Sequence, residues 1–334
     1  MHRQDFLQKN AETPLCEHYL AAGSVCSLTT NCEDLLQAAR DTFLPVESRP
    51  DSVDFSLRFW VNGAGADSPQ QGWPKPYVRG VDHLIFAGFD ANSSLLADLR
   101  TRRVIGRFSA AMARDARHWR TVIFPMLLSI MAGSAGLIEL HASCVAKNDG
   151  GLILAGPSRS GKSTLAMAFK VAGFRLLSDD RTFCSLERGK LQAWGLPRPL
   201  KLRPEAASWF DGFRDREPTD IQNGERVFHF EARETETPKC VPQLLVFLEK
   251  HEGTEFCMMP MAAGEARSHI EAELLAETPE TIRKQTEVVE QVLLLPRYRL
   301  RYGGRPQEIA REIAASFLNA AGHPSLNGDK WRAS

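Results

Sequence analysis

The sequence lacks a net charge. Lysine and arginine together number 41, and aspartate and glutamate together also number 41, so the formal net charge at pH 7 is zero. A balanced chain has no overall positive field that would attract nucleic acid or an anionic membrane. We therefore expect no nucleic acid and no membrane among its partners.

The sequence also lacks the cysteine spacing of disulfide scaffolds and zinc sites. Its seven cysteines are an odd number, and none of them form a C-x-x-C pair. A chain of 334 residues needs no disulfides to support its core. The first residues, Met1-His2-Arg3-Gln4-Asp5, lack the apolar stretch of a signal peptide. Reduced thiols in a cytoplasmic protein are the simplest interpretation.

Long apolar runs are nearly absent. The longest run without a charged residue covers 121–138, and Pro125, Gly133 and Gly136 interrupt it. A membrane span needs about 20 consecutive apolar residues. We predict instead a buried helix over 116–132 that glycine brings to an end.

What the sequence contains falls into two parts. In the first part, residues 54–61 alternate apolar with polar or charged side chains, as half-buried strands do, and a short helix is expected after Cys32. We predict a small, mostly β (α+β) domain over 1–114, which could bind a substrate or partner. From 115 to 334 strands and helices alternate, which is typical of an α/β domain.

The strongest motif lies in this second part. It reads Gly156-Pro157-Ser158-Arg159-Ser160-Gly161-Lys162-Ser163, the G-x-x-x-x-G-K-[ST] phosphate loop or Walker A pattern. An apolar run over 152–155 precedes it and a helix-forming segment over 164–170 follows, which is the context the motif requires. In such a loop backbone N–H groups wrap a polyphosphate, the lysine neutralises its charge and the serine hydroxyl ligates Mg²⁺. The sequence thus predicts ATP and Mg²⁺, held by Gly156, Ser158, Arg159, Ser160, Gly161, Lys162, Ser163 and Thr164.

Around this loop the pattern predicts two hairpins. One joins a strand over 137–146 to the strand of the loop through Asn148-Asp149-Gly150, and the other covers 182–194 and turns at Arg188-Gly189. A strand over 174–178 comes between them, and we expect it to lie next to the strand of the loop. Further strands are expected at 244–248 and 255–259, and helices at 263–276, 279–292 and 305–319.

An acidic pair follows the strand 174–178. Asp179 and Asp180 stand 17 and 18 residues after Lys162, and one carboxylate could ligate Mg²⁺ while the other accepts a proton or orients an acceptor. The rival metal ligand is Glu249, but Leu248 stands where transporter-type ATPases carry aspartate. We favour the pair. The plain alternative for the pair is a solvated turn after a strand.

Basic residues near the pair are open to two interpretations. His141, which is 21 residues before Lys162, could serve catalysis or be an ordinary core or edge residue. Arg181 could stabilise charge in the transition state or pair with Asp180. Arg198, Lys201 and Arg203, in a proline-rich stretch, could hold an acidic acceptor or form a solvated loop.

Three segments of this sequence resemble the catalytic domain of HPr kinase/phosphorylase and, more closely, the broader HPr kinase-like proteins. They are Leu140-His141-Ala142-Ser143, the loop Gly156 to Thr164, and Gly173-Phe174-Arg175-Leu176-Leu177-Ser178-Asp179-Asp180. The resemblance covers roughly residues 135–200. It implies a fold like that of phosphoenolpyruvate (PEP) carboxykinase, use of Mg²⁺ and ATP, and phosphoryl transfer to a serine hydroxyl. It also implies catalytic and metal roles for Asp179 and Asp180, phosphate binding by Lys162, a metal role for Ser163 and an accessory role for His141.

The sequence departs from this family at two positions of the loop. HPr kinases usually carry glycine where Arg159 stands and an acidic residue where Thr164 stands. Neither the later loop linked to the phosphorylase reaction nor the family's N-terminal region is recognisable. HPr kinase-like proteins also occur as tailoring kinases for ribosomally made peptides, including lasso peptide precursors, and this chain is similar to those in its loop and its Ser-Asp-Asp motif.

The sequence therefore predicts an α/β protein with a P-loop kinase domain of the HPr kinase/PEP carboxykinase type behind a smaller N-terminal domain. Its expected activity is Mg-ATP-dependent phosphoryl transfer to a serine or similar hydroxyl of a peptide or protein, which makes it a transferase. Two alternatives stay open: a nucleotide-binding regulatory ATPase, and a peptide-binding module without a phosphoacceptor. A homo-oligomer is also possible.

Overall fold

The computed structural model describes residues 12–62, 72–196, 200–214, 216–222, 225–228, 238–274 and 278–319. The chain folds as two units. The first consists of Met1–Gly136 with Leu275–Lys284, and the second consists of Leu137–Leu274 with Gln285–Ser334. The predicted division between residues 114 and 115 stays a prediction, and the segment 115–136 groups with the first unit.

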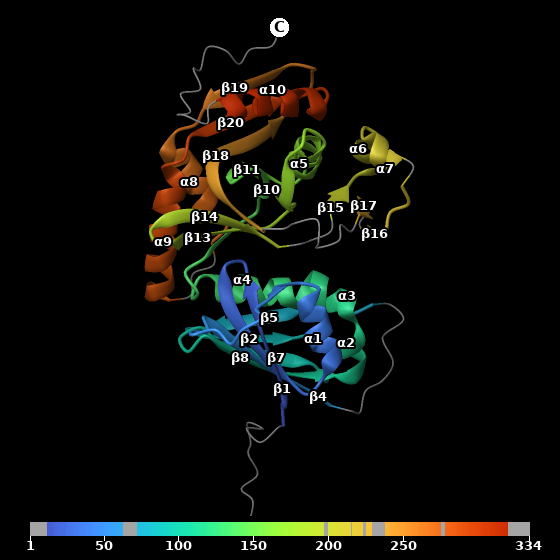
Figure 1. Cartoon of the computed structure of the whole chain (residues 1–334), viewed down its shortest axis with the longest axis vertical. Helices are drawn as coiled ribbons and strands as arrows, with labels where there is room; N and C mark the ends of the chain where they lie inside the picture. The colour runs from blue at the N-terminus through green and yellow to red at the C-terminus, as the bar shows by residue number, and fades with distance from the viewer. Residues whose placement is uncertain are drawn as a thin grey trace, which may run out of the picture. The chain divides into compact units, whose positions relative to one another are not determined.

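The first unit is built on one eight-stranded sheet with the order β3-β1-β2-β4-β8-β7-β6-β5 (Figure 1). Neighbouring strands are antiparallel except for β4, which runs parallel to both β2 and β8. The predicted strand over 54–61 is thus confirmed as β4. The strands are β1 (Leu15–Ala21), β2 (Ser24–Thr30), β3 (Leu44–Pro45), β4 (Phe55–Asn62), β5 (Tyr77–Val81), β6 (Leu84–Gly88), β7 (Ser94–Asp98) and β8 (Arg103–Ser109).

Helices cover one face of this sheet. They are α1 (Glu33–Arg40), α2 (Ala110–Arg114), α3 (Ala116–His118), a π-helical turn η1 (Trp119–Ile123) and α4 (Phe124–Ala132). The sheet and the helices meet in an aromatic core, where the Trp119 ring lies 5.6 Å from Phe59 and 4.6 Å from Phe108. The predicted buried helix over 116–132 is confirmed, although the π turn interrupts it. Within the described residues, no helix combines the length and apolar character that crossing a membrane requires.

The second unit contains a nine-stranded sheet. Seven of its strands follow the order β12-β10-β11-β18-β14-β13-β9, β20 also pairs with β18, and β19 pairs with β20. The strands are β9 (Ile138–Leu140), β10 (Ser143–Lys147), β11 (Gly150–Ala155), β12 (Arg175–Ser178), β13 (Thr182–Glu187), β14 (Lys190–Gly195), β18 (Lys239–Lys250), β19 (Phe256–Pro260) and β20 (Arg297–Tyr302). Both predicted hairpins, β10–β11 and β13–β14, are confirmed.

Two predictions about this sheet are wrong. The segment 137–146 is not one strand, because it splits into β9 and β10 with His141 and Ala142 between them. The strand β12 is not a neighbour of β11, because β10 lies between them and pairs with both. The apolar pattern indicates strands here, but it does not show that β9 pairs with β13 while β10 pairs with β11 and β12.

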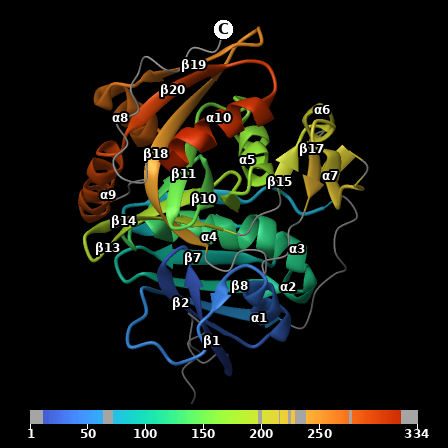
Figure 2. The ribbon, with the colours of Figure 1, turned by 45° about the horizontal axis from the view of Figure 1, so that its top comes forward.

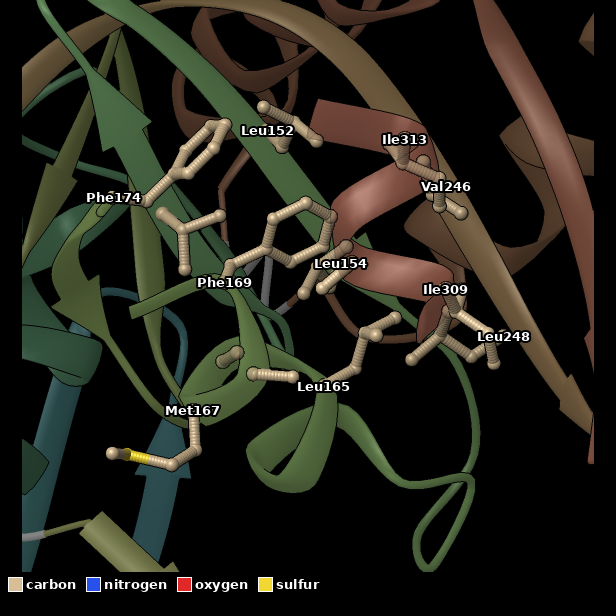
Figure 3. Packing of buried hydrophobic residues seen from close by; sticks show 14 of the residues in the cluster. Leu152, Leu154, Leu165, Met167, Phe169, Phe174, Val246, Leu248, Ile309 and Ile313 are labelled. Carbon is tan, nitrogen blue, oxygen red and sulfur yellow. The ribbon is translucent and has the colours of Figure 1, made fainter. Parts of the chain in front are cut away.

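Helices cover both faces of the second sheet. Figures 1 and 2 show α5 (Lys162–Val171) and α10 (Pro306–Asn319) on one side, and α8 (Ala263–Glu271) and α9 (Pro279–Leu293) on the other. Each side has its own apolar core. In the first core, Leu152 and Leu154 of β11 pack beside Leu165 and Phe169 of α5 (Figure 3). Strands buried on both faces read as continuous apolar runs, which is why β11 was recognisable in the sequence.

A smaller three-stranded sheet, of order β15-β17-β16, stands beside α5 (Figure 1). Its strands are β15 (Leu200–Leu202), β16 (Asp220–Gln222) and β17 (Glu225–Phe228), and two short helices, α6 (Pro204–Ala207) and α7 (Asp211–Arg214), accompany it. Leu200, Leu202 and Phe228 belong to the same apolar core as α5. Arg198 of the predicted basic stretch lies outside the described residues. The structure is thus a mixed α/β fold, as the sequence predicts, and it contains several sheets.

Candidate functional site

The predicted phosphate loop connects β11 to α5, and α5 begins at Lys162 itself. Gly156 and Gly161 adopt positive φ angles of 142° and 94°. A Cβ atom on Gly156 would lie 2.9 Å from the carbonyl oxygen of Leu248, and one on Gly161 would collide with the hydroxyl of Tyr302. Both the backbone angles and the lack of space therefore require glycine at the two invariant positions of the motif.

Arg159 also has a positive φ angle, of 70°. Its side chain is exposed, as is that of Ser158, whereas Ser160 is buried and Ser163 and Thr164 are half-buried. Left-handed backbone is strained for a residue with a Cβ atom. Arg159, where HPr kinases usually carry glycine, therefore has a backbone conformation that favours glycine.

Lys162 folds back over its own loop. Its Nζ donates hydrogen bonds to the carbonyl oxygens of Gly156 at 2.7 Å and Pro157 at 3.2 Å. Burial lowers the pKa of Lys162, while the negative charges of Asp180, Glu273 and Asp179 oppose this shift. The ammonium group and both carboxylates of the predicted acidic pair thus share one electrostatic environment.

Tyr302, at the end of β20, holds the phosphate loop through its side chain. Its buried hydroxyl donates a hydrogen bond of 2.8 Å to the carbonyl oxygen of Ser160. Burial raises the pKa of Tyr302, so the hydroxyl keeps its proton. The same oxygen excludes any side chain at position 161. No local sequence pattern indicates this role for Tyr302, because it lies 142 positions away from Ser160 along the chain.

The acidic pair lies at the same edge of the sheet as the loop. Both β11 and β12 run antiparallel to β10, so they run in the same direction and end at the same edge. Asp179 and Asp180 follow β12 directly, as the loop follows β11. The intervening strand β10 does not prevent the predicted convergence.

Asp179 is buried, with 5% of its surface exposed. Its Oδ2 accepts a hydrogen bond of 3.1 Å from the backbone N–H of Lys201, while its Oδ1 has no hydrogen-bond partner among the described residues. Burial raises the pKa of Asp179 to about 7; the Ser163 hydroxyl and the Lys201 N–H lower it, and the charge of Asp180 raises it. A buried carboxylate oxygen without a partner is a place where a cation is expected.

Hydroxyl groups fix the backbone of this acidic turn. Thr182 Oγ1 donates to the carbonyl oxygen of Ala142 at 2.8 Å and lies 3.1 Å from Ser178 Oγ. Ser143 Oγ donates to the carbonyl oxygen of Asp179. Arg181 forms an ion pair of 2.8 Å with Glu139 of β9. This contact attaches the acidic turn to the sheet, a role that the sequence does not predict for Arg181.

His141 lies in the gap between β9 and β10, with its side chain about half exposed. Its Nε2 is 3.4 Å from Asp180 Oδ1. Its backbone N–H donates a hydrogen bond of 3.0 Å to Oε2 of Glu273, which lies just beyond the end of α8. Glu273 was not predicted, because no local pattern distinguishes it from the other exposed glutamates of that region. His141, Asp180 and Glu273 form the solvent-facing side of the site.

Glu249, the rival metal ligand, is engaged elsewhere. It forms ion pairs with Arg301 Nε at 3.2 Å and with Arg299 Nε at 3.8 Å, both on the neighbouring strand β20. The residue whose backbone lies beside Gly156 is Leu248, which is buried and apolar. The geometry therefore favours Asp179 and Asp180 over Glu249.

The residues present suit a magnesium ion bound together with phosphate oxygens. No group of three or more His, Cys, Asp and Glu side chains within the described ranges could hold a metal ion without further ligands. Mg²⁺ is commonly bound by one or two protein groups, with substrate phosphates and waters completing its octahedron. The Ser163 hydroxyl would supply one oxygen ligand of this kind, and Asp179 Oδ1, which has no hydrogen-bond partner among the described residues, would supply another.

Comparisons with known proteins give little further information. No family model matches the chain, and no curated protein sequence matches it. Among solved structures, the chain is similar to the Hpr(Ser) kinase/phosphatase from Coxiella burnetii, with 13% sequence identity and a TM-score of 0.31. The match covers 55% of this chain and 93% of that chain. This likeness is too weak to identify the fold or the activity.

Proposed function

We propose that this protein is a Mg-ATP-dependent kinase that transfers the γ-phosphoryl group to a serine or similar hydroxyl of a peptide or protein. The observation that carries the proposal is the convergence of Lys162 with two carboxylates that differ in environment. Asp179 is buried, and its Oδ1 has no hydrogen-bond partner in the part of the chain that the structure describes, whereas Asp180 is about half exposed beside His141. One carboxylate for the metal and one for the acceptor is the division of roles that phosphoryl transfer requires.

The buried half of the site holds the phosphates and the metal. Lys162 would exchange its hydrogen bonds to the loop carbonyls for bonds to phosphate oxygens, and the N–H groups of the loop would bind the remaining phosphate oxygens. Ser163 and Asp179 would hold Mg²⁺. Mg²⁺ held by these two residues would supply positive charge against the negative charge that develops on the phosphate oxygens.

The exposed half of the site receives the acceptor. Asp180 would orient the acceptor hydroxyl and take its proton, and His141 would hold Asp180 in place at 3.4 Å. Because both side chains are about half exposed, a hydroxyl on a large partner can reach them. Accessibility of this kind supports a peptide or protein acceptor.

The test is the fate of the γ-phosphate. ATP labelled at its γ-phosphate is incubated with the full chain, Mg²⁺ and an array of serine-, threonine- and tyrosine-containing peptides. We expect labelled peptide from the natural chain, no nucleotide binding for Lys162→Ala, and at least ~100-fold slower transfer with ATP still bound for Asp179→Asn and Asp180→Asn. Lys170→Ala, at the far end of α5, and Asp149→Asn, in the β10–β11 turn, are the matched controls.

Two results would contradict the proposal. Full transfer in both aspartate variants would exclude the proposed site. Release of the label only as inorganic phosphate, with every peptide of the array, would instead favour a regulatory ATPase.

A further inference from the structure

Within the described residues of the first unit, the helices pack against one face of its sheet, and the opposite face is here called the outer face. Outward positions on β5 to β8 carry apolar side chains that are exposed or half-buried: Tyr77, Val81, Leu84, Phe86, Leu96 and Ile105. Their neighbours Ile85, Ala87, Leu95 and Ala97 point to the opposite face and are buried. Contiguous apolar side chains on an open surface commonly mark an interaction site.

The outer face is basic as well as apolar. Arg58, Arg79, Arg103 and Arg107 occupy outward positions on β4, β5 and β8, whereas Asp98 is the one acidic residue at the outward positions of β4 to β8. One cross-strand row runs Arg79–Phe86–Leu96–Ile105–Arg58. Three apolar residues are thus flanked by an arginine at each end. A partner that matches this face carries apolar and acidic side chains.

The strand β5 is the edge of this sheet and pairs only with β6 among the described strands. All five of its residues are exposed, and Val81 is 76% exposed. An edge strand presents alternate backbone N–H and C=O groups that a further strand can pair with. Extended peptides bind to such edges through the main chain, and alternate side chains then determine which peptide fits.

We propose that β5 is the docking site for an extended peptide segment of a partner protein with the pattern apolar–x–acidic–x–apolar. The outward residues of β5 are Tyr77, Arg79 and Val81, so a paired strand places three of its own side chains beside them. The acidic residue lies opposite Arg79, and the two apolar residues lie opposite Tyr77 and Val81.

Contacts already present favour this register. The Arg79 guanidinium lies 5.2 Å from the centre of the Tyr77 ring, and its Nε donates to the Tyr77 hydroxyl at 2.5 Å. These contacts hold the positive charge on the outer face rather than letting it extend into water. The arginine is therefore oriented before a peptide binds.

A second copy of this chain fits the edge less well. Arg79 is the middle residue of the five-residue strand, so a symmetric antiparallel pairing of β5 with itself would put two arginines directly opposite each other. Like charges in directly opposed positions destabilise a strand pair. The docking site is also independent of the proposed phosphoryl transfer, because it lies wholly within the first unit.

The test is a selection without nucleotide, so its failure and that of the proposed kinase activity are distinguishable. A library of ten-residue peptides displayed on phage is panned on the immobilised full chain. We expect the apolar–x–acidic–x–apolar pattern to be enriched, and the synthetic consensus peptide to bind at least tenfold more weakly to Arg79→Glu. Arg114→Glu, on the helix-covered side of the first unit, has the same change in charge and should bind like the natural chain.

A charge swap makes the test more stringent. The Arg79→Glu chain should prefer the consensus peptide with lysine in place of its acidic residue. The proposal is overturned by any of three results: no enriched pattern, equal binding of the consensus peptide to Arg79→Glu, or a dimer of the natural chain that dissociates in Val81→Lys.

Discussion

The two large sheets of this protein, one in each unit, differ in what covers their faces. The sheet of the second unit has an apolar core on each face, and its reactive groups gather where β11 and β12 end. The sheet of the first unit is packed on one face and carries exposed side chains on the other, and among the described strands its edge strand β5 pairs only with β6. A sheet covered on both sides can position groups rigidly for chemistry, whereas an open sheet offers surface and backbone for binding.

The largest expected effect concerns packing. Leu154→Ala, in β11 on the sheet face that α5 and α10 cover, should lower the free energy of unfolding by about 3–5 kcal/mol, because loss of the fully buried side chain leaves a cavity. Leu96→Ala, on the outer face of the first sheet, should cost about 0.5 kcal/mol, because that side chain is already partly in water. Urea unfolding followed by circular dichroism measures both, and losses of equal size would mean that the two sheets do not differ as described.

The second prediction concerns buried charge. The pKa of Asp179 is about 7 in the folded chain, above its ordinary value. Below pH 4 the carboxyl is protonated in both states, so its contribution to stability is complete there and is lost as pH rises towards 7. Asp179→Asn should therefore stabilise the chain above pH 7, by up to about 4 kcal/mol, and leave it unchanged near pH 4. Unfolding measured from pH 4 to pH 8 tests this.

Asp98, on the sheet of the first unit, is the matched control for Asp179, because its pKa is shifted in the opposite direction. Partial burial raises its pKa, but the hydroxyl and N–H of Thr101 and the N–H of Arg100 outweigh this, so its pKa lies below the ordinary value. Asp98→Asn should therefore destabilise the chain at neutral pH, by less than about 1 kcal/mol, and this cost should disappear as pH falls below 4. Changes of the same sign in the two variants would contradict the comparison.

These two units also differ in how much of them the sequence predicted. The strands β10, β11 and β18, with the loop and Asp179, were recognisable because apolar runs and the glycine motif are local signals. Other features were not recognisable, because each depends on contacts between residues far apart in the sequence. They are the split at His141, the position of β10 between β11 and β12, and the roles of Tyr302 and Glu273. In the first sheet, the alternation of apolar and polar residues indicated a strand. The order of the strands and the exposed outer face depend on strand pairing, which no local pattern encodes.

The third prediction tests the support of the loop. Tyr302→Phe should lower the free energy of unfolding by about 1–2 kcal/mol, because the buried carbonyl of Ser160 loses its only side-chain donor described here. Tyr77→Phe, on the exposed edge strand, should cost under about 0.5 kcal/mol. Calorimetric titration should also find weaker nucleotide binding in Tyr302→Phe alone. Unchanged binding there would mean that β20 does not fix the loop.

The smallest expected effect concerns backbone strain, which both units contain. Arg159 in the loop and Arg102 in the β7–β8 turn have φ angles of 70° and 54°, where glycine is less strained than any residue with a Cβ atom. Replacing either by glycine should raise the free energy of unfolding by up to about 1 kcal/mol, because relief of strain exceeds the added flexibility of the unfolded chain. Since the Arg159 side chain is exposed, nucleotide affinity should stay within about threefold in Arg159→Gly, as in Arg102→Gly. A tenfold loss in Arg159→Gly alone would instead mean that this arginine covers the phosphates, and that the departure from glycine serves nucleotide binding at the expense of stability.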